Sequence, residues 1–240
     1  MIPLKNLDPR RSFPFLTIAL IVANFVVFFH QISLPAKAAD AFIYHYGLVP
    51  ARVSEFLASA RHVSAADAFL PFFTCMFLHG GWLHILGNMW FLWIFGANVE
   101  DRLGGTVYLL FYFVCGLFSG VTQTVFSWGS HIPSVGASGA IAGVLGAFIV
   151  FFPRSRILTL VPLIVFWFLA RIPAVVFIGL WFVVQFFSGV SSLSVSRASE
   201  MGGVAWWAHV GGFMMGAILA LVVNGASGGQ RRRSAYYEQY

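Results

Sequence analysis

The chain has 240 residues, of which 59% are hydrophobic and only 9% are charged, and its formal net charge is +6. Soluble domains carry about 25% charged residues, so this composition excludes an ordinary soluble protein and indicates a membrane protein. The positive charge does not indicate nucleic-acid binding, because most of the Lys and Arg residues flank apolar segments. The two cysteines are too few for a disulfide framework.

Six apolar segments are candidates for membrane-spanning helices, which need about 20 residues. They follow a short basic segment, 1–12, which we expect to be cytoplasmic and to lead into a first anchor rather than a cleaved signal peptide. The sequence therefore predicts an all-α membrane protein with one six-helix domain over residues 13–225. The predicted spans are about 13–31, 79–98, 106–127, 136–152, 172–190 and 205–224.

Three further segments are not predicted to span. The long loop at about 32–78 is expected on the outer side, with short interfacial helices. The apolar stretch 157–170 is too short to cross, because about 14 residues separate Arg156 from Arg171 and Pro162 interrupts them, so we expect an interfacial or re-entrant piece on the cytoplasmic side. The polar tail, 226–240, is expected to be cytoplasmic and disordered.

Basic residues near the helix ends predict the orientation. With the N-terminus inside, both termini are cytoplasmic, ten basic residues lie on the cytoplasmic side and four lie outside. Because no targeting sequence is evident, we expect a prokaryotic cytoplasmic membrane. The inner set is Lys5, Arg10, Arg11, Arg102, Arg154, Arg156, Arg171, Arg231, Arg232 and Arg233, and the outer set is Lys37, Arg52, Arg61 and Arg197.

Unusual polar residues occur near the outer ends of three spans that run in the same direction. The second span carries His84 and Asn88, the fourth carries Ser138 and the sixth carries His209. Polar groups within a membrane are costly and usually face the bundle interior or a water-filled cavity. About 15 residues, or about 22 Å of helix, separate Ser138 from Phe152, so Ser138 is expected several ångströms below the outer surface of a core about 30 Å thick.

Small residues spaced three or four apart occur next to two of these polar groups. The fourth span has Gly139, Gly143 and Gly146, and the sixth has Gly212 and Gly216. Such a pattern lets two helices approach backbone to backbone. If these two faces meet, Ser138 and His209 meet as well.

These residue types suit acyl transfer to water. A serine hydroxyl becomes a good nucleophile when a base takes its proton, and we assign these roles to Ser138 and His209. His84 and Asn88, four residues apart on one helix face, can donate to an oxyanion together with the backbone N–H of Ser138. No Asp or Glu lies in the outer half of a predicted span, so a Ser–His dyad is predicted rather than a triad.

The same residues also allow simpler interpretations. A single serine in a membrane helix usually bonds to its own backbone, and a single histidine is often structural. His79, His84 and His209 could ligate a metal, but an H-E-x-x-H motif is absent and no acidic base accompanies them. We expect no metal and no cofactor, and a structural role for His79.

Taken together, the motifs resemble the rhomboid family of intramembrane serine proteases. The matching segments, over about 12–225, are HILGN at 84–88, GASG at 136–139 and AHVGGFMMG at 208–216. The resemblance implies a six-helix bundle that cleaves transmembrane substrates with Ser138 and His209, and an oxyanion hole made by His84, Asn88 and the Ser138 backbone. A non-catalytic relative that binds membrane clients is the alternative.

Two positions depart from the family pattern. Many members carry a Trp-Arg pair in the first outer loop, where this chain has FLPF at 69–72. Some members place a Tyr four residues after the serine, stacked on the catalytic histidine, where this chain has Ala142. The second departure leaves His209 less firmly held unless Trp206, Trp207 or a Phe takes the place of that ring.

Overall fold

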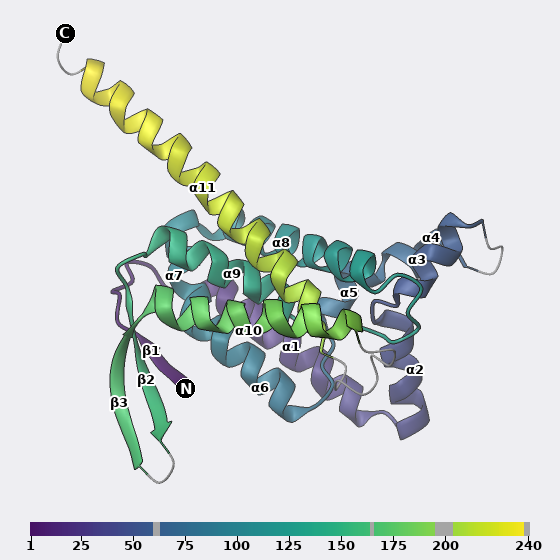
Figure 1. Ribbon diagram of the computed structural model, residues 1–240. Coiled ribbons are helices and arrows are strands. Elements are labelled where there is room, and N and C mark those ends of the chain that lie inside the picture. Colours follow the sequence, from purple (N-terminus) through teal and green to yellow (C-terminus); the bar gives the residue numbers. More distant parts are fainter. Residues whose placement is uncertain (60–62, 164–165, 195–203, 238–240) are drawn as a thin grey trace.

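The computed structural model describes residues 1–59, 63–163, 166–194 and 204–237, and most of them are helical (Figure 1). Within these residues, four helices are individually long and apolar enough to cross a membrane. They are α1 (Phe15–Ser33), α8 (Gly105–Phe126), α10 (Ala174–Ser194) and α11 (Trp206–Tyr237). They match four of the six predicted spans, and the protein is an integral, multi-pass membrane protein.

The other two predicted spans have less regular counterparts. The second is a continuous helical run made of α6 (Trp82–Phe91), the π-helix η2 (Leu92–Gly96) and α7 (Ala97–Leu103). It counts as a fifth span when joined to residues 65–77, from which it bends by 76°. The fourth is α9 (Ser138–Phe151), whose 14 residues are fewer than the roughly 20 that a full crossing needs.

The long loop between α1 and α6 folds into short helices, as expected. They are α2 (Ala36–Tyr46), α3 (Pro50–Leu57), α4 (Ala65–Phe69), α5 (Pro71–Thr74) and the 3-10 helix η1 (Cys75–Phe77). They gather at the end of the bundle where α8 ends and α9 begins (Figure 1).

A three-stranded antiparallel sheet, β1–β2–β3, makes the all-α prediction wrong in this part of the chain. The strands are β1 (Ile2–Asn6), β2 (Arg156–Leu163) and β3 (Phe166–Pro173). The apolar stretch 157–170 is therefore a hairpin that pairs with the N-terminal segment. β-Branched residues and Pro162 disfavour a helix there, and the stretch is too short to span, so strand pairing satisfies its backbone.

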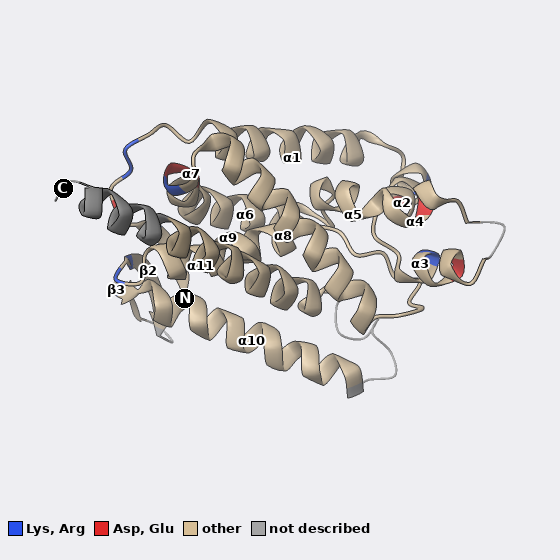
Figure 2. Cartoon of the chain, turned by 90° about the horizontal axis from the view of Figure 1, so that it is seen from above, with Lys and Arg blue, Asp and Glu red and all other residues tan. Residues whose placement is uncertain are grey.

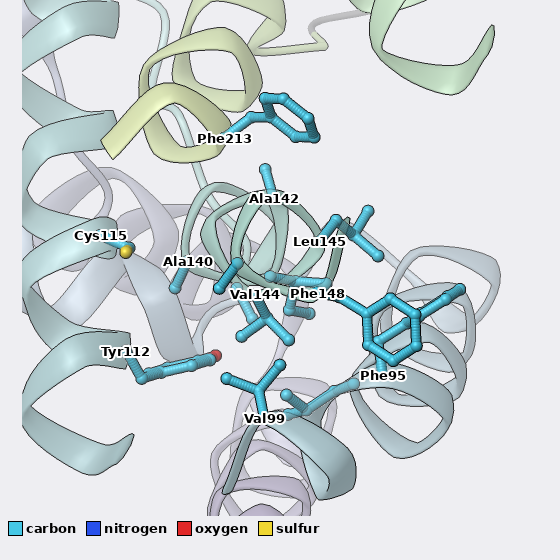
Figure 3. Packing of buried hydrophobic residues seen from close by; sticks show 14 of the residues in the cluster. Phe95, Val99, Tyr112, Cys115, Ala140, Ala142, Val144, Leu145, Phe148 and Phe213 are labelled. Atoms are coloured by element: carbon cyan, nitrogen blue, oxygen red, sulfur yellow. The ribbon is translucent and has the colours of Figure 1, made fainter. Parts of the chain in front are cut away.

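Helix α9 occupies the centre of the bundle. Residues Gly139 to Phe148 of this helix are all buried. Figure 3 shows Tyr112 and Cys115 of α8 on one side of α9, Phe95 and Val99 on another, and Phe213 of α11 above it. The first residue of this central helix, Ser138, is partly exposed at its end.

Two carboxylates, of which Glu100 is buried and Asp101 is partly exposed, tie the ends of helices together opposite the short loop helices. Glu100 accepts hydrogen bonds from the backbone N–H of Leu16 (2.9 Å) and from both the N–H (2.8 Å) and the hydroxyl (2.7 Å) of Thr17. It thereby caps the start of α1, where backbone donors lack helical partners. Asp101 accepts from the backbone N–H groups of Arg11 and Ser12. Figure 2 shows most of the coloured Lys and Arg residues at this same end.

The polar tail was expected to be disordered, but the backbone of α11 remains helical to Tyr237 (Figure 1). Extending a helix costs less than starting one, since each added residue gains a hydrogen bond without a new nucleus. Two of the basic residues assigned to the outer side, Arg61 and Arg197, lie outside the described residues.

Candidate active site

The glycine faces of α9 and α11 meet directly. A Cβ atom added to Gly212 would contact the backbone carbonyl of Gly139, and one added to Gly216 would contact that of Gly143. A Cβ on Gly146 would in turn meet the backbone of Phe213. The two helices are therefore as close as their backbones allow, as the small-residue pattern predicted.

This crossing brings Ser138 and His209 into contact. Ser138 Oγ and His209 Nε2 are 2.7 Å apart, although 71 residues separate them in the sequence. Ser138 is the first residue of α9, so its backbone N–H is at the positive end of the helix. His209 is buried, with 8% of its surface exposed. The pair has the geometry in which an imidazole can take the hydroxyl proton.

His84 and Asn88 of α6 face the segment just before Ser138. A Cβ atom at Gly136 would lie 2.8 Å from His84 Nε2 and 3.5 Å from Asn88 Nδ2. Gly136 has a φ of 129°, which other residues rarely adopt, and its N–H donates to the carbonyl of Cys75 (2.9 Å). Glycine thus lets this backbone segment pass close to the two side chains.

The side chains of His84 and Asn88 each offer an N–H donor toward the space beside Gly136. Nδ1 of His84 accepts from the backbone N–H of Gly80 (3.2 Å), so the proton of the neutral ring is on Nε2. Nδ2 of Asn88 is buried and has no hydrogen-bond partner among the residues that the structure describes. Buried donors are normally paired, so an unpaired one suggests a ligand oxygen.

Two cavities meet at Ser138 and His209. One, of about 440 Å³, is lined by the loop residues Gly80, Val135 and Ala205 as well as by the four polar residues. The other, of about 290 Å³, lies between α6, α9 and α10 and is lined mainly by apolar side chains. Its lining includes Leu83, whose side chain is 90% exposed on the outer surface of α6.

Helix α10 contributes two residues to the site that were not predicted. Gln185 Oε1 is 2.6 Å from His209 Nδ1, and the ring of Trp181 lies 5.8 Å from the imidazole. Of the rings suggested to hold His209, Trp206 meets it edge-on at 6.4 Å, whereas Trp207 stacks on Phe126 instead. Gln185 interrupts an otherwise apolar stretch of α10, which is the same signal that identified His84 and Asn88.

The third histidine of this region, His79, is fully buried, and its ring lies 5.2 Å from that of His84. Its backbone is held by Gln31 of α1, which donates to the His79 carbonyl (2.7 Å) and accepts from its N–H (3.3 Å). Among the residues that the structure describes, no three His, Cys, Asp or Glu side chains are arranged to hold a metal ion.

Comparison with known proteins identifies relatives of this chain. Residues 66–225 match the Rhomboid domain. The chain is similar to "Rhomboid protein 1, mitochondrial" of Saccharomyces cerevisiae, with 32% identity over 165 residues, which cover 65% of this chain and 42% of that protein. It is also similar to "Rhomboid protease GluP" of Bacillus subtilis, with 31% identity over 157 residues, 65% of this chain and 27% of that protein.

A plant relative covers more of the chain. "RHOMBOID-like protein 4" of Arabidopsis thaliana is 27% identical over 232 residues, which are 89% of this chain and 54% of that protein. The chain thus spans about half the length, or less, of these relatives. They include mitochondrial and plant proteins, so they do not support the expected prokaryotic membrane. The matched domain covers two thirds of the sequence, and the protein is a member of the rhomboid family.

Proposed function

We propose that this protein is an intramembrane serine endopeptidase that hydrolyses peptide bonds in or next to the transmembrane segments of other membrane proteins. The 2.7 Å contact between Ser138 Oγ and His209 Nε2, inside a cavity that is also lined by the buried Nδ2 donor of Asn88, carries the proposal. The family includes proteases, as the name of the GluP relative states.

In the proposed reaction, Ser138 Oγ attacks the carbonyl carbon of the scissile bond while His209 Nε2 takes its proton. The negative charge that develops on the carbonyl oxygen is stabilised by three donors, namely the Ser138 N–H, His84 Nε2–H and Asn88 Nδ2–H. His209 then gives its proton to the leaving amine, and an ester on Ser138 remains. Water, activated by His209, hydrolyses that ester and regenerates the hydroxyl.

The two cavities suit the two substrates of such a reaction. The apolar cavity beside α6 and α10 reaches from Leu83, on the outer surface of the bundle, to Ser138, and fits an apolar segment entering from the lipid. The second cavity is lined by loop residues and fits water. No metal or cofactor is needed for any step.

The membrane topology is part of the proposal. We infer six crossings, in which α9 spans with only 14 residues because the loop before Ser138 dips below the outer surface. That loop is protected by protein, since Leu48 and Ser134 exchange backbone hydrogen bonds of 3.0 and 2.8 Å. The catalytic domain then covers residues 13–225, and the basic end that carries both terminal segments faces the cytoplasm.

The direct test is cleavage of a single-span model substrate by the purified full chain in liposomes. Wild type is expected to cut, and Ser138→Ala and His209→Ala are expected to be inactive. Ser119→Ala is the matched control, because Ser119 is a buried serine of α8 that bonds to the Gly116 carbonyl (2.7 Å) and lines neither cavity. Equal cleavage by all four proteins would refute the proposal, and no cleavage by any would favour the non-catalytic alternative.

A further inference from the structure

Besides Ser138, the imidazole of His209 makes a short polar contact with Gln185. Its Oε1 is 2.6 Å from His209 Nδ1, and the side chain is buried, with 6% of its surface exposed. Trp181, one turn earlier on the same face of α10, lies against the imidazole ring. Two side chains on one face of α10 therefore contact His209.

The hydrogen-bond arrangement has a chemical consequence. For His209 to accept the Ser138 proton, Nε2 must be unprotonated, so the proton of the neutral ring must be on Nδ1. An amide oxygen next to Nδ1 accepts a hydrogen bond from that N–H and favours this tautomer. The same acceptor stabilises the second N–H when the ring becomes an imidazolium during the reaction.

We propose that Gln185 is a positioning residue. It completes a hydrogen-bonded series Ser138–His209–Gln185 and holds the imidazole in the productive tautomer and orientation. This inference rests on the proposed function of the same site. It also accounts for Ala142, because Gln185 and Trp181 hold the ring in the absence of a tyrosine at that position.

The first test compares Gln185→Leu with wild type. Loss of the acceptor is expected to lower kcat by about 10- to 100-fold with KM little changed, the range typical when a metal-bound histidine loses its hydrogen-bond partner. Gln123→Leu is the matched control, because Gln123 is a buried glutamine that accepts from the Ala208 N–H (3.2 Å) and donates to Ser127. It is expected to lower thermal stability but to leave the pH–rate profile unchanged.

The second test uses Gln185→Glu, which separates positioning from mere packing. A carboxylate keeps the acceptor and should restore most of the activity. It also stabilises the imidazolium, so the acidic limb of the pH–rate profile should move to higher pH. Among the described residues, the other titratable side chain that lines the cavity with His209 is His84 of α6, and it is the same in all these proteins.

These experiments distinguish an error about Gln185 from a failure of the proposed function. If Ser138→Ala is inactive while Gln185→Leu equals wild type, only the inference about Gln185 is wrong. An acidic limb that stays in place in Gln185→Glu would also overturn it. If Gln185→Leu does not fold, the profile of Gln185→Glu decides alone.

A separate observation concerns the β2–β3 hairpin, which exposes four consecutive apolar residues outside every helix. The exposed fractions are 73% for Phe166, 62% for Trp167, 48% for Phe168 and 60% for Leu169. In Figure 1 the hairpin runs across the direction of α10 and extends past the side of the bundle. Because the helices cross the membrane, the hairpin lies along the membrane plane.

Basic residues accompany the base of this hairpin. Lys5 and Arg171 flank Leu158 on neighbouring strands and share one face with it, and Arg156 follows on the same face. All three basic side chains are exposed, whereas Ile157 and Thr159, on the opposite face, are fully buried. Aromatic residues beside Lys and Arg are typical of segments at the boundary between acyl chains and anionic headgroups.

We infer that the hairpin lies in the interface of the leaflet at the basic end of the bundle, with Trp167 and its neighbours at the acyl boundary and Lys5, Arg156 and Arg171 on anionic lipid headgroups. This inference does not depend on the proposed proteolysis. Lys and Arg side chains near such a surface are attracted to its anionic headgroups.

The test places a fluorophore on Trp167→Cys in a Cys75→Ala, Cys115→Ala chain reconstituted in liposomes of phosphatidylcholine with or without phosphatidylglycerol. Lipids with a shallow nitroxide should quench it more than aqueous iodide does, whereas a probe on Asp40→Cys, an exposed position of α2, should respond mainly to iodide. Arg156→Gln with Arg171→Gln should reduce lipid quenching only when phosphatidylglycerol is present. Iodide quenching as strong as at Asp40, or no effect of the arginines, would overturn the inference.

Discussion

Gly216 permits a test of the site in which neither Ser138 nor His209 is altered. It lies on α11, two turns beyond His209, and lines neither cavity. A Cβ atom added there would be 2.5 Å from the carbonyl carbon and 2.6 Å from the Cα of Gly143. Carbon atoms pack at about 3.5–4.0 Å, and backbone cannot rotate away, so α9 and α11 would have to separate by about 1 Å.

The expected size of the effect follows from that displacement. The contact of 2.7 Å between Ser138 Oγ and His209 Nε2 would lengthen beyond hydrogen-bond range. A misplacement of about 1 Å typically costs about 100-fold in rate, so kcat of Gly216→Ala should fall by about that factor. Overpacking should lower the free energy of unfolding by about 1–3 kcal/mol, partly offset by about 1 kcal/mol from the helix propensity of alanine.

Cleavage of the single-span substrate and thermal unfolding are measured on the same preparations. Gly179→Ala is the matched control, because Gly179 is also a helical glycine, in α10, but nothing lies within 4 Å of its added Cβ. The control should keep wild-type kcat and equal or higher stability. Wild-type activity in Gly216→Ala would refute the argument that the glycine crossing sets the distance between serine and histidine.

Three other substitutions follow from the same geometry. Asn88→Ala should lower kcat by about 10²–10³ in the cleavage assay without lowering the unfolding temperature, since it removes one of the proposed oxyanion donors. A rate equal to wild type would make Asn88 structural only. Gly136→Ala should reduce kcat far more than Gly129→Ala, because both positions have positive φ but only the first would displace His84; equal rates would contradict this. Glu100→Gln should destabilise the protein by about 1–3 kcal/mol in reversible unfolding, because one oxygen cannot serve all its donors, while the activity of the folded fraction is unchanged.

Much of the helical framework could be predicted from the sequence, because it depends on local features. Long apolar segments identify α1, α8, α10 and α11 directly. Small residues four apart predicted which faces of α9 and α11 meet, and that pairing brings Ser138 to His209. The short α9 was harder to identify as a span, since its length alone does not decide it.

The sheet was not predictable in the same way. Residues 157–170 are apolar, but their strand conformation depends on pairing with each other and with residues 2–6, about 150 positions away in the sequence. Residues from one segment carry little information about a partner so far along the chain. The stretch therefore forms paired strands rather than a helix, and its expected position at the cytoplasmic interface stays a prediction.

By itself the sequence determined that the protein resides in a membrane, and it indicated the serine, the histidines and the asparagine as candidate site residues, because polar groups among apolar residues stand out at any position. The tertiary structure alone decided how these groups are held. Gln185 reaches His209 from another helix, and Glu100 caps α1 from 83 residues away. Such contacts depend on how the helices pack together, which the pattern of residues along one helix does not specify.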